Sequence, residues 1–415
     1  MKWEFYKKEQ CRLCGCRDLE LVIELAPTPP GNHFVSEDKL GLAQASYPLE
    51  VCFCSMCHHL QLGHVVNPEI LYQKHYSYVS GTSPVFVKHL KEYAFEIISR
   101  FPIPKDALVI DIGSNDGTAL SFFKAAGYRV LGIDPATEIA QAANENGIQT
   151  LCAFFNLGVA KKYSPEFGKA ALINSHNACA HIDDLKSVMQ GVHHWLAENG
   201  IFVMEVGYLV DIYEKVWFDT IYHEHLDFHS VEPLLRFFQE SGFEVISIQR
   251  TSPQGGSIRV ISQKIGGPYK ADASVQELVR LERSLGLDKA ETFKDFNIRL
   301  NEVKKKLSKL INELKAKKKT IAGYGAPTKA TTLLTYFNLG TALDFLVDDN
   351  PLKQNLYSPG HHIPVYAAES LYSRKPDYLL VLAWNFADDI MERHSAYKTQ
   401  GGKFIVPMPE PRIID

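Results

Sequence analysis

The sequence contains no stretch of about 18 consecutive apolar residues, so it predicts no membrane span. It also lacks an excess of positive charge, with 44 Lys and Arg against 48 Asp and Glu, which argues against a nucleic-acid partner. The first nine residues contain no apolar signal core, and we therefore expect a cytosolic protein whose thiols stay reduced. The 415 residues are 46% hydrophobic, which suffices for about two to four domains with their own cores.

Cysteine is scarce except at the N-terminus, where six of the eight cysteines lie within the first 57 residues. Two C-x-x-C knuckles in this segment can each direct two thiolates at one ion and together complete a tetrahedral zinc site. The ligands we expect are Cys11, Cys14, Cys54 and Cys57. Cys16 or Cys52 could replace a neighbour, and a redox pair is the alternative, although neither knuckle has the strand-to-helix setting of a redox motif. A structural Zn²⁺ would stabilise a segment with a thin core.

The middle of the chain reads as a β-α-β unit. A buried strand over residues 108–112 leads into a glycine turn and a helix, and a second strand over 129–133 ends in Asp134. An acidic residue about 20 positions after the glycine turn is placed to bind ribose hydroxyls. Further strands over 170–176 and 200–206 continue the alternation, which predicts an α/β fold with a doubly wound sheet.

The glycine turn has the pattern D-x-G-x-x-x-G with an acidic interior, not G-x-G-x-x-G. A pyrophosphate would be repelled by Asp116 at the start of the helix, whereas a cationic sulfonium would accept it. The turn therefore favours S-adenosylmethionine, and a dinucleotide is the alternative. The cofactor-binding residues that we expect are Asp111, Gly113, Asn115, Asp116, Gly117, Asp134 and, beyond the strand 170–176, Asn177.

A run of titratable side chains, residues 222–225, follows the strand 200–206 in an irregular connection. Ligands of a doubly wound sheet lie at the carboxyl ends of its strands, so this run and His181 are candidates for proton transfer. A polar surface loop is the simpler interpretation of such a run taken alone. A metal site that includes His225 and His229 is disfavoured, because H-E-x-x-H is absent.

A charged helix with leucines at helical spacing is predicted over residues 289–319, joining domains rather than lying on a membrane surface. A second β-α-β unit follows, with a G-x-G-x-x-x-K turn that lacks an acidic interior. Its backbone N–H groups and the lysine suit a phosphate or diphosphate. The substrate-binding residues that we expect are Gly323, Tyr324, Gly325, Lys329, Asp348 and Asn385.

Taken together, these segments resemble the sugar C-methyltransferases of deoxysugar biosynthesis. The motifs that carry the resemblance are Cys-Arg-Leu-Cys-Gly at 11–15, Cys-Ser-Met-Cys-His-His-Leu-Gln-Leu at 54–62, Asp-Ile-Gly-Ser-Asn-Asp-Gly at 111–117, Ala-His-Ile-Asp-Asp-Leu at 180–185, Phe-Asp-Thr-Ile-Tyr-His-Glu-His at 218–225, Gly-Tyr-Gly-Ala-Pro-Thr-Lys at 323–329 and Leu-Ala-Trp-Asn-Phe at 382–386. The resemblance implies a zinc-binding domain over 1–75, a methyltransferase domain over 76–265, a helical linker over 266–319 and a Rossmann-like domain over 320–415.

The resemblance also implies a nucleotide-linked 4-keto-6-deoxy sugar as acceptor, with dTDP or GDP as carrier, and we expect a monomer. The C4 ketone acidifies the C3 proton, and His225 is the base that we expect to remove it. Tyr222 and His181 would hydrogen-bond the developing enolate, Glu224 would orient a partner, and Tyr76 matches an active-site tyrosine of the family. An NAD-dependent nucleotide-sugar oxidoreductase and a non-catalytic zinc-ribbon interaction protein are the alternatives.

Overall fold

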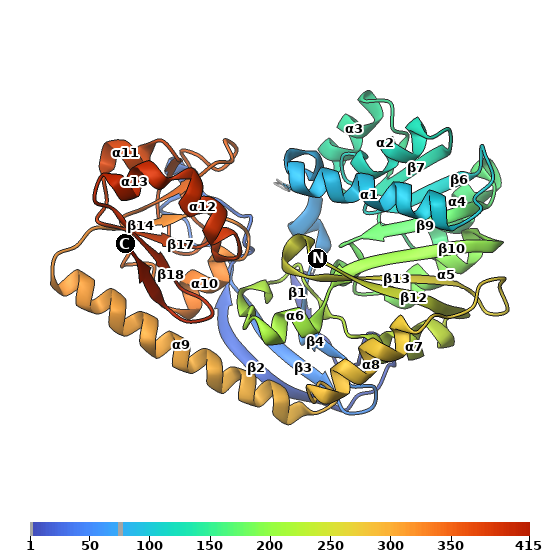
Figure 1. Ribbon diagram of the computed structural model, residues 1–415, viewed down its shortest axis with the longest axis horizontal. Helices are drawn as coiled ribbons and strands as arrows, with labels where there is room; N and C mark the ends of the chain where they lie inside the picture. The colour runs from blue at the N-terminus through green and yellow to red at the C-terminus, as the bar shows by residue number, and fades with distance from the viewer. Residues whose placement is uncertain (1–2, 74–77) are drawn as a thin grey trace.

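A computed structural model describes residues 3–73 and 78–415 of the chain. Three sheets dominate it, each from a different part of the sequence, and Figure 1 shows the C-terminal sheet set apart from the larger central one. The N-terminal sheet lies between these two in that view. Within the described residues no helix has the length and apolar character needed to cross a bilayer.

The N-terminal part forms a four-stranded antiparallel sheet in the order β11-β4-β3-β2. Its strands are β2 (Leu19–Thr28), β3 (Tyr47–Cys54), β4 (Leu60–Leu62) and β11 (Asp227–Phe228). The last of these comes from the centre of the chain and pairs with β4 through Asp227 opposite Gln61. A separate two-stranded sheet joins β1 (Phe5–Lys7) to β5 (His64–Val66). A segment from the middle of the sequence therefore completes the N-terminal sheet.

The central sheet has seven strands in the order β12-β13-β10-β9-β6-β7-β8. Its strands are β6 (Leu108–Ile112), β7 (Arg129–Asp134), β8 (Thr150–Cys152), β9 (Ala170–His176), β10 (Leu196–Gly207), β12 (Phe243–Thr251) and β13 (Ser257–Lys264). The first five are parallel, and β13 pairs antiparallel with both β10 and β12. Strand order reverses between β6 and β9, and ligands of open α/β sheets bind beyond the carboxyl ends at such a switch point.

Helices cover both faces of the central sheet, as parallel strands require. They are α1 (Pro84–Arg100), α2 (Thr118–Ala125), α3 (Thr137–Glu145), α4 (Leu157–Phe167), α5 (Leu185–Trp195), α6 (Leu209–Glu214) and α7 (Val231–Glu240). The core strands are almost wholly apolar and buried, β6 along its entire length. Polar side chains of the central part are thereby concentrated at the strand ends.

The C-terminal sheet has the order β16-β15-β14-β17-β18-β19, parallel except for the last strand. Its strands are β14 (Ile321–Tyr324), β15 (Phe345–Asp348), β16 (Val365–Ala367), β17 (Tyr378–Val381), β18 (Lys403–Val406) and β19 (Arg412–Ile414). Its helices are α10 (Ala330–Tyr336), α11 (Ser370–Arg374), α12 (Ala387–Arg393) and α13 (Ser395–Thr399). Order reverses between β14 and β17, so this second Rossmann-like sheet has its own switch point.

Two helices connect the central and C-terminal sheets: α8 (Ser274–Ser284) and α9 (Ala290–Ala316). The carboxylate of Glu282 accepts hydrogen bonds from the backbone N–H groups of Val231 and Glu232, which caps the start of α7. The long α9 buries an apolar stripe at helical spacing and lies along β2, with Phe293 packed on Phe53 at 5.7 Å between ring centroids. It runs from the N-terminal sheet to the C-terminal one (Figure 1).

Candidate active site and zinc site

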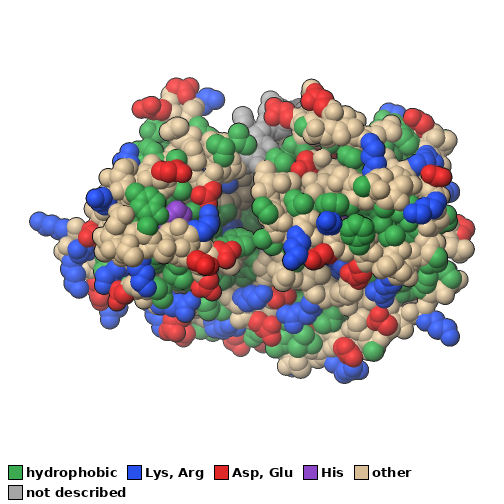
Figure 2. All heavy atoms as spheres, turned by 45° about the horizontal axis from the view of Figure 1, so that its top comes forward, with side chains coloured by type: hydrophobic (Ala, Val, Ile, Leu, Met, Phe, Trp, Pro, Cys, Tyr) green, Lys and Arg blue, Asp and Glu red, His purple; other side chains and the backbone are tan. Residues whose placement is uncertain are grey.

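A cavity of about 720 Å³ lies where the three parts of the chain meet. Figure 2 shows the molecule hollowed between the part that carries the C-terminal sheet and the rest. The wall combines the carboxyl ends of β6, β7 and β9 with the irregular loop after β10, and residues 327–329 face them from the C-terminal part. Residues 65–72 of the N-terminal part close another side. The cavity thus joins the predicted cofactor site, at the strand ends of the central sheet, to the predicted substrate site in the C-terminal part.

The end of β6 supplies the first part of the wall. Gly113 has φ +73°, and a Cβ there would lie 2.3 Å from that of Ala178, so the turn requires glycine. Asp134, at the end of β7, accepts the backbone N–H groups of Asn115 and Ala136, each at 2.9 Å. Burial raises the pKa of this carboxyl above its ordinary value. Asp134 is therefore held rigidly in the wall, where it can accept further hydrogen bonds.

Two residues of the glycine turn, Asn115 and Asp116, also hold the segment before α1. The side chain of Asn115 accepts the N–H of Ser80 at 2.8 Å and donates to the carbonyl of Tyr78 at 3.1 Å. Asp116 accepts the N–H of Gly81 at 2.8 Å and lies outside the cavity wall, as does Gly117. The sequence argument gave Asp116 a direct effect on the cofactor, but the structure uses its carboxylate to anchor residues 80–82.

The cofactor side of the wall suits a sulfonium compound with an amino-acid tail. Asp111, Asp134 and Asn177 line it, while the lysines of the described wall, Lys329 and Lys353, both come from the C-terminal part. Asp111 has a buried carboxylate oxygen without a hydrogen-bond partner. Such an acceptor is costly to bury unless a ligand or water satisfies it. The residues present therefore fit S-adenosylmethionine.

Hydrogen bonds at both ring nitrogens fix His225. Its Nδ1 lies 2.8 Å from the carbonyl oxygen of Thr220, which can only accept, so Nδ1 carries the proton and Nε2 keeps its electron pair. The hydroxyl of Tyr222 donates to Nε2 over 2.8 Å. Burial lowers the pKa of His225 to about 4, against the opposing effect of the Thr220 carbonyl. At neutral pH His225 is therefore a neutral imidazole in the wall of the cavity, with Nε2 as its basic atom.

Glu224 is buried beside His225, and burial raises its pKa to about 7. Asn32 donates a hydrogen bond from Nδ2 to Oε1 of Glu224 over 2.9 Å, and its own Oδ1 accepts the hydroxyl of Thr328 at 2.9 Å. Lys353 acts on Glu224 electrostatically and lowers its pKa. Asn32 thereby links the loop after β10 to the C-terminal part. Sequence reasoning missed Asn32 and Lys353, since neither lies in a motif.

His181 lies against His225, with 5.1 Å between ring centroids. The hydroxyl of Tyr72 is 3.2 Å from its Nδ1. Burial, and then the charge of His225, hold the pKa of His181 well below its usual value. The structure therefore brings together four of the five expected catalytic residues, His181, Tyr222, Glu224 and His225. The fifth, Tyr76, lies outside the described residues.

His223 had no role in the sequence argument. The structure buries it, with Nε2 donating to the carbonyl of Tyr47 in β3 over 3.1 Å. Its ring also meets that of Tyr47 edge to face at 5.8 Å. His223 therefore ties the loop after β10 to the N-terminal sheet.

Lys329 and Asn385 are the expected substrate residues that line the cavity. The ammonium of Lys329 donates to Oδ1 of Asn385 and lies 4.8 Å from the centre of the Trp217 ring. Burial lowers the pKa of Lys329, and nearby Asp219 opposes that shift. A partly buried cation stacked on an aromatic ring is prepared to meet an anion.

The other four expected substrate residues lie behind the wall. Gly323 is buried in β14, and Gly325 has φ +88° in the turn after it. The hydroxyl of Tyr324 donates to Asp349, and Asp348 accepts the N–H groups of Ala326 and Asn350. These contacts shape the turn and do not reach the cavity. The carboxylate of Asp348 is occupied by backbone N–H groups and that of Asp349 by the side chains of Tyr324 and Arg393, which periodicity alone could not reveal.

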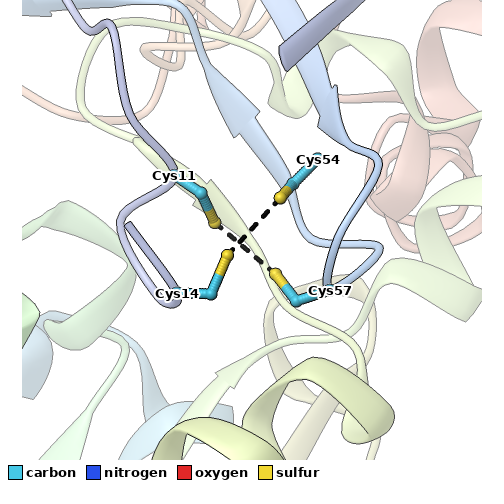
Figure 3. A group of neighbouring side chains, drawn as sticks. All are labelled: Cys11, Cys14, Cys54 and Cys57. Carbon is cyan, nitrogen blue, oxygen red and sulfur yellow. Dashed lines mark hydrogen bonds between the residues drawn. The ribbon is translucent and has the colours of Figure 1, made fainter. Parts of the chain in front are cut away.

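The four expected zinc ligands converge on one point (Figure 3). All their sulfur atoms lie within 4.8 Å of one another, with Cys11 3.5 Å from Cys57 and Cys14 3.6 Å from Cys54. A tetrahedral ion with Zn–S bonds of about 2.3 Å requires sulfurs about 3.8 Å apart. The group therefore fits zinc with four thiolate ligands and no open position. Cys16 and Cys52 stand outside it.

Three family models match successive parts of the chain. Residues 11–72 match a model described as "Putative zinc binding domain", residues 86–248 a "Methyltransferase domain" and residues 252–409 a "C-methyltransferase C-terminal domain". The chain is 36% identical over 408 residues to the C-methyltransferase NovU of Streptomyces niveus. That match covers 98% of this chain and 97% of the relative.

Two solved structures are similar over less than half of the chain. The PH0226 protein of Pyrococcus horikoshii OT3 is 14% identical, with a TM-score of 0.36, covering 45% of this chain and 94% of that one. Magnesium protoporphyrin IX methyltransferase of Synechocystis PCC 6803, with bound SAH, is 12% identical, with a TM-score of 0.34, covering 43% and 83%. The assignment rests on the relative that matches over the whole length.

Proposed function

Because this chain belongs to the sugar C-methyltransferase family, we propose that it methylates C3 of a dTDP- or GDP-linked 4-keto-6-deoxy sugar. It is an S-adenosylmethionine-dependent C-methyltransferase with a structural zinc site, which replaces the oxidoreductase and non-catalytic alternatives. The observation that carries the proposal is the neutral His225 in a cavity between the cofactor side and the partly buried Lys329.

His225 acts as the base of the reaction. A carbon bound to hydrogen is not a nucleophile until that proton leaves, and the C4 ketone makes the C3 proton acidic. The electron pair on Nε2 takes the proton once the Tyr222 hydroxyl has turned away from it, while the Thr220 carbonyl holds Nδ1–H and hence the orientation of the ring. The imidazolium that forms pairs with the negative enolate, which opposes the effect of burial on the pKa of His225.

Tyr222 and His181 stabilise the enolate oxygen. The hydroxyl of Tyr222 donates to His225 before substrate binds, and it moves its hydrogen bond to the substrate carbonyl oxygen, the future enolate oxygen, as Nε2 takes the proton. His181 also contacts the ring of His225. Glu224 orients a partner side chain among these residues. Because its pKa is about 7, it can also hold a proton near neutral pH. Tyr76 joins the set by family resemblance.

The cofactor side serves the second substrate. S-adenosylmethionine supplies a methyl group made electrophilic by its sulfonium. Asp134 would bind the ribose hydroxyls, and Asp111, Gly113 and Asn177 would hold the remainder from the strand ends that they occupy. The glycine at 113 permits close approach of a ligand to the backbone.

The nucleotide diphosphate lies on the C-terminal side of the cavity. Lys329 and Lys353 are the Lys residues of the described wall, and both are partly buried, with pKa values lowered by desolvation. Desolvated ammonium groups gain strongly from an anion placed beside them. Asn385, which accepts from Lys329, fixes the direction of that side chain.

The test is incubation of the enzyme with S-adenosylmethionine and a panel of dTDP- and GDP-linked 4-keto-6-deoxyhexoses. A mass gain of one methylene group identifies the acceptor, and NMR of the product distinguishes C3 from C5, since both carbons flank the C4 ketone. The proposal is abandoned if no member of the panel is methylated at carbon. Methylation at C5 would retain the chemistry and correct the position.

A further inference from the structure

Arg12 lies between two zinc ligands, yet its side chain reaches the loops of the active site. It is fully buried, and Nη1 donates to the carbonyl of Leu226 over 3.1 Å and to that of Leu62 over 2.9 Å. Its Nε donates to Oδ1 of Asp183 over 2.9 Å. One guanidinium therefore binds the N-terminal sheet and two loops of the central part.

Both loops carry residues of the proposed mechanism. Leu226 directly follows His225, and Asp183 is two positions after His181. The N–H of Leu226 donates to the carbonyl of Ala180 over 2.8 Å, so the two loops are also bonded to each other next to these histidines. A displacement of the guanidinium would consequently move His181 and His225 together.

The zinc knuckle fixes the backbone from which Arg12 extends. The N–H of Cys11 donates to the carbonyl of Cys16 at 2.8 Å, and that of Gly15 to Cys11 at 2.9 Å. The N–H of Arg12 itself donates to Oε1 of Gln61 in β4 at 2.8 Å. Four thiolates on one ion hold this turn in a single geometry.

We propose that Arg12 is a positioning residue that transmits the geometry of the zinc knuckle to His181 and His225. An ion held by the four cysteines would then help to place these histidines as well as stabilise the fold. This inference rests on the proposed function, because it takes the two histidines as groups that touch the substrate. Displacement of a reacting group by about 1 Å can cost 100-fold in rate.

Arg12→Met tests the proposal, with Arg17→Met as the matched control. Arg17 belongs to the same segment but is exposed. Zinc per chain, melting temperature and S-adenosylmethionine affinity are measured first. We expect Arg12→Met to keep one zinc and the cofactor affinity, while kcat falls about 100-fold and KM changes less than about threefold. Arg17→Met should match the wild type throughout.

Two readouts separate positioning from general stabilisation. Exchange of the C3 proton of a dTDP-4-keto-6-deoxyhexose with deuterated solvent, without S-adenosylmethionine, should slow in parallel with kcat. The imidazole NMR signals of His181 and His225, assigned from single histidine variants, should shift in Arg12→Met and not in Arg17→Met. Unchanged signals with unchanged kcat would overturn the proposal, as would loss of zinc and cofactor binding in step with activity.

Asp183→Asn removes the charge that pairs with Arg12, and with Lys8, without altering the knuckle. It tests the proposal if Arg12→Met does not fold. It should reproduce the imidazole shifts and the fall in kcat, and wild-type values for both would overturn the proposal. If the wild type neither exchanges the C3 proton of the sugar with solvent nor methylates the sugar, the proposed function fails. The NMR comparison of Arg12→Met and Arg17→Met then still tests the positioning.

Discussion

Asn32 donates a 2.9 Å hydrogen bond to the carboxylate of Glu224, although 192 residues separate the two in the chain. The donor belongs to the loop between β2 and β3, and its Oδ1 accepts from Thr328 beyond β14. Gly31, next to it, sits so close to Thr328 that an added Cβ would lie 2.3 Å from the Thr328 carbonyl. One amide thus connects the zinc-bearing part, the proposed catalytic loop and the C-terminal part.

Replacing Asn32 by alanine should change the titration of Glu224. The hydrogen bond from Asn32 lowers the pKa of that carboxyl, so its loss raises the pKa above about 7. We expect the limb of the kcat–pH profile that reports the titration of Glu224 to move to higher pH. The free energy of unfolding should fall by about 1–3 kcal/mol, because a buried acceptor loses its donor. Rates measured from pH 5 to 9 check this.

Gln44→Ala is the control for that variant. Gln44 also joins the β2–β3 loop to the C-terminal part, accepting the N–H of Gly360 at 2.7 Å, but it lies outside the cavity wall. A pH profile of Gln44→Ala that moves as far as that of Asn32→Ala would assign the effect to loop docking and not to Glu224.

His225→Ala should abolish turnover, by about 10²- to 10⁴-fold or more, while S-adenosylmethionine binds with near-normal affinity. Tyr222→Phe removes the hydroxyl that donates to Nε2 but keeps the ring, so it should lower kcat with a smaller effect on KM. Single-turnover rates and calorimetry give both quantities. Activity of His225→Ala equal to the wild type would remove this histidine from the role of base.

Cys57→Ser should release zinc and destabilise the protein strongly, because the remaining thiolates no longer close the tetrahedron. Cys16→Ser is the matched control, since Cys16 lies in the same segment outside the four-sulfur group. Zinc content by mass spectrometry and melting curves with and without a chelator distinguish the two. Equal zinc loss in both variants would mean that Cys16 is a ligand.

The free energy of unfolding should fall as the pH decreases from 6.5 to 4. Burial lowers the pKa of His223, His225 and His229 from 6.5 to about 4, so the unfolded chain binds three protons in this range that the folded protein excludes. Glu224 acts in the opposite direction between pH 4.5 and 7, because its folded pKa is raised. The combined effect of the three histidines on the free energy of unfolding is larger than that of Glu224.

Each of these histidines contributes about 3 kcal/mol across its full pKa shift. In His223→Gln the free energy of unfolding should therefore fall less steeply as the pH decreases. A glutamine amide can still donate to the Tyr47 carbonyl but binds no proton in this range. Urea unfolding at pH 7, 6, 5 and 4 measures the slope. An unfolding free energy of the wild type that stays constant over this range would contradict the prediction.

Local patterns in the sequence sufficed to predict the two β-α-β units and the four cysteines that converge. The strand predicted over 108–112 coincides with β6, and the helix predicted over 289–319 corresponds to α9. The C-x-x-C spacing located the four cysteines because two knuckles have few other ways to meet. Such features depend on neighbours in the chain, which a sequence displays directly.

Contacts between segments that are distant in the chain could not be predicted from local patterns. Nothing in the periodicity of residues 27–34 indicates that Asn32 will meet Glu224, because the contact depends on how three parts of the chain pack. The placement of Asp116 away from the cavity has the same origin, since its partners in residues 80–82 lie well upstream. The direction of a polar side chain at a turn is set by its tertiary partners, not by the turn motif.

The pairing of β11 with β4 has a consequence for fragments of this protein. A polypeptide cut before residue 78 would keep the four cysteines but leave the outer edge of β4 unpaired, because the strand that covers it is Asp227–Phe228. Exposed sheet edges recruit strands from other molecules. Such a fragment should self-associate even with zinc bound, whereas a chain that extends through residue 228 carries its own edge cover.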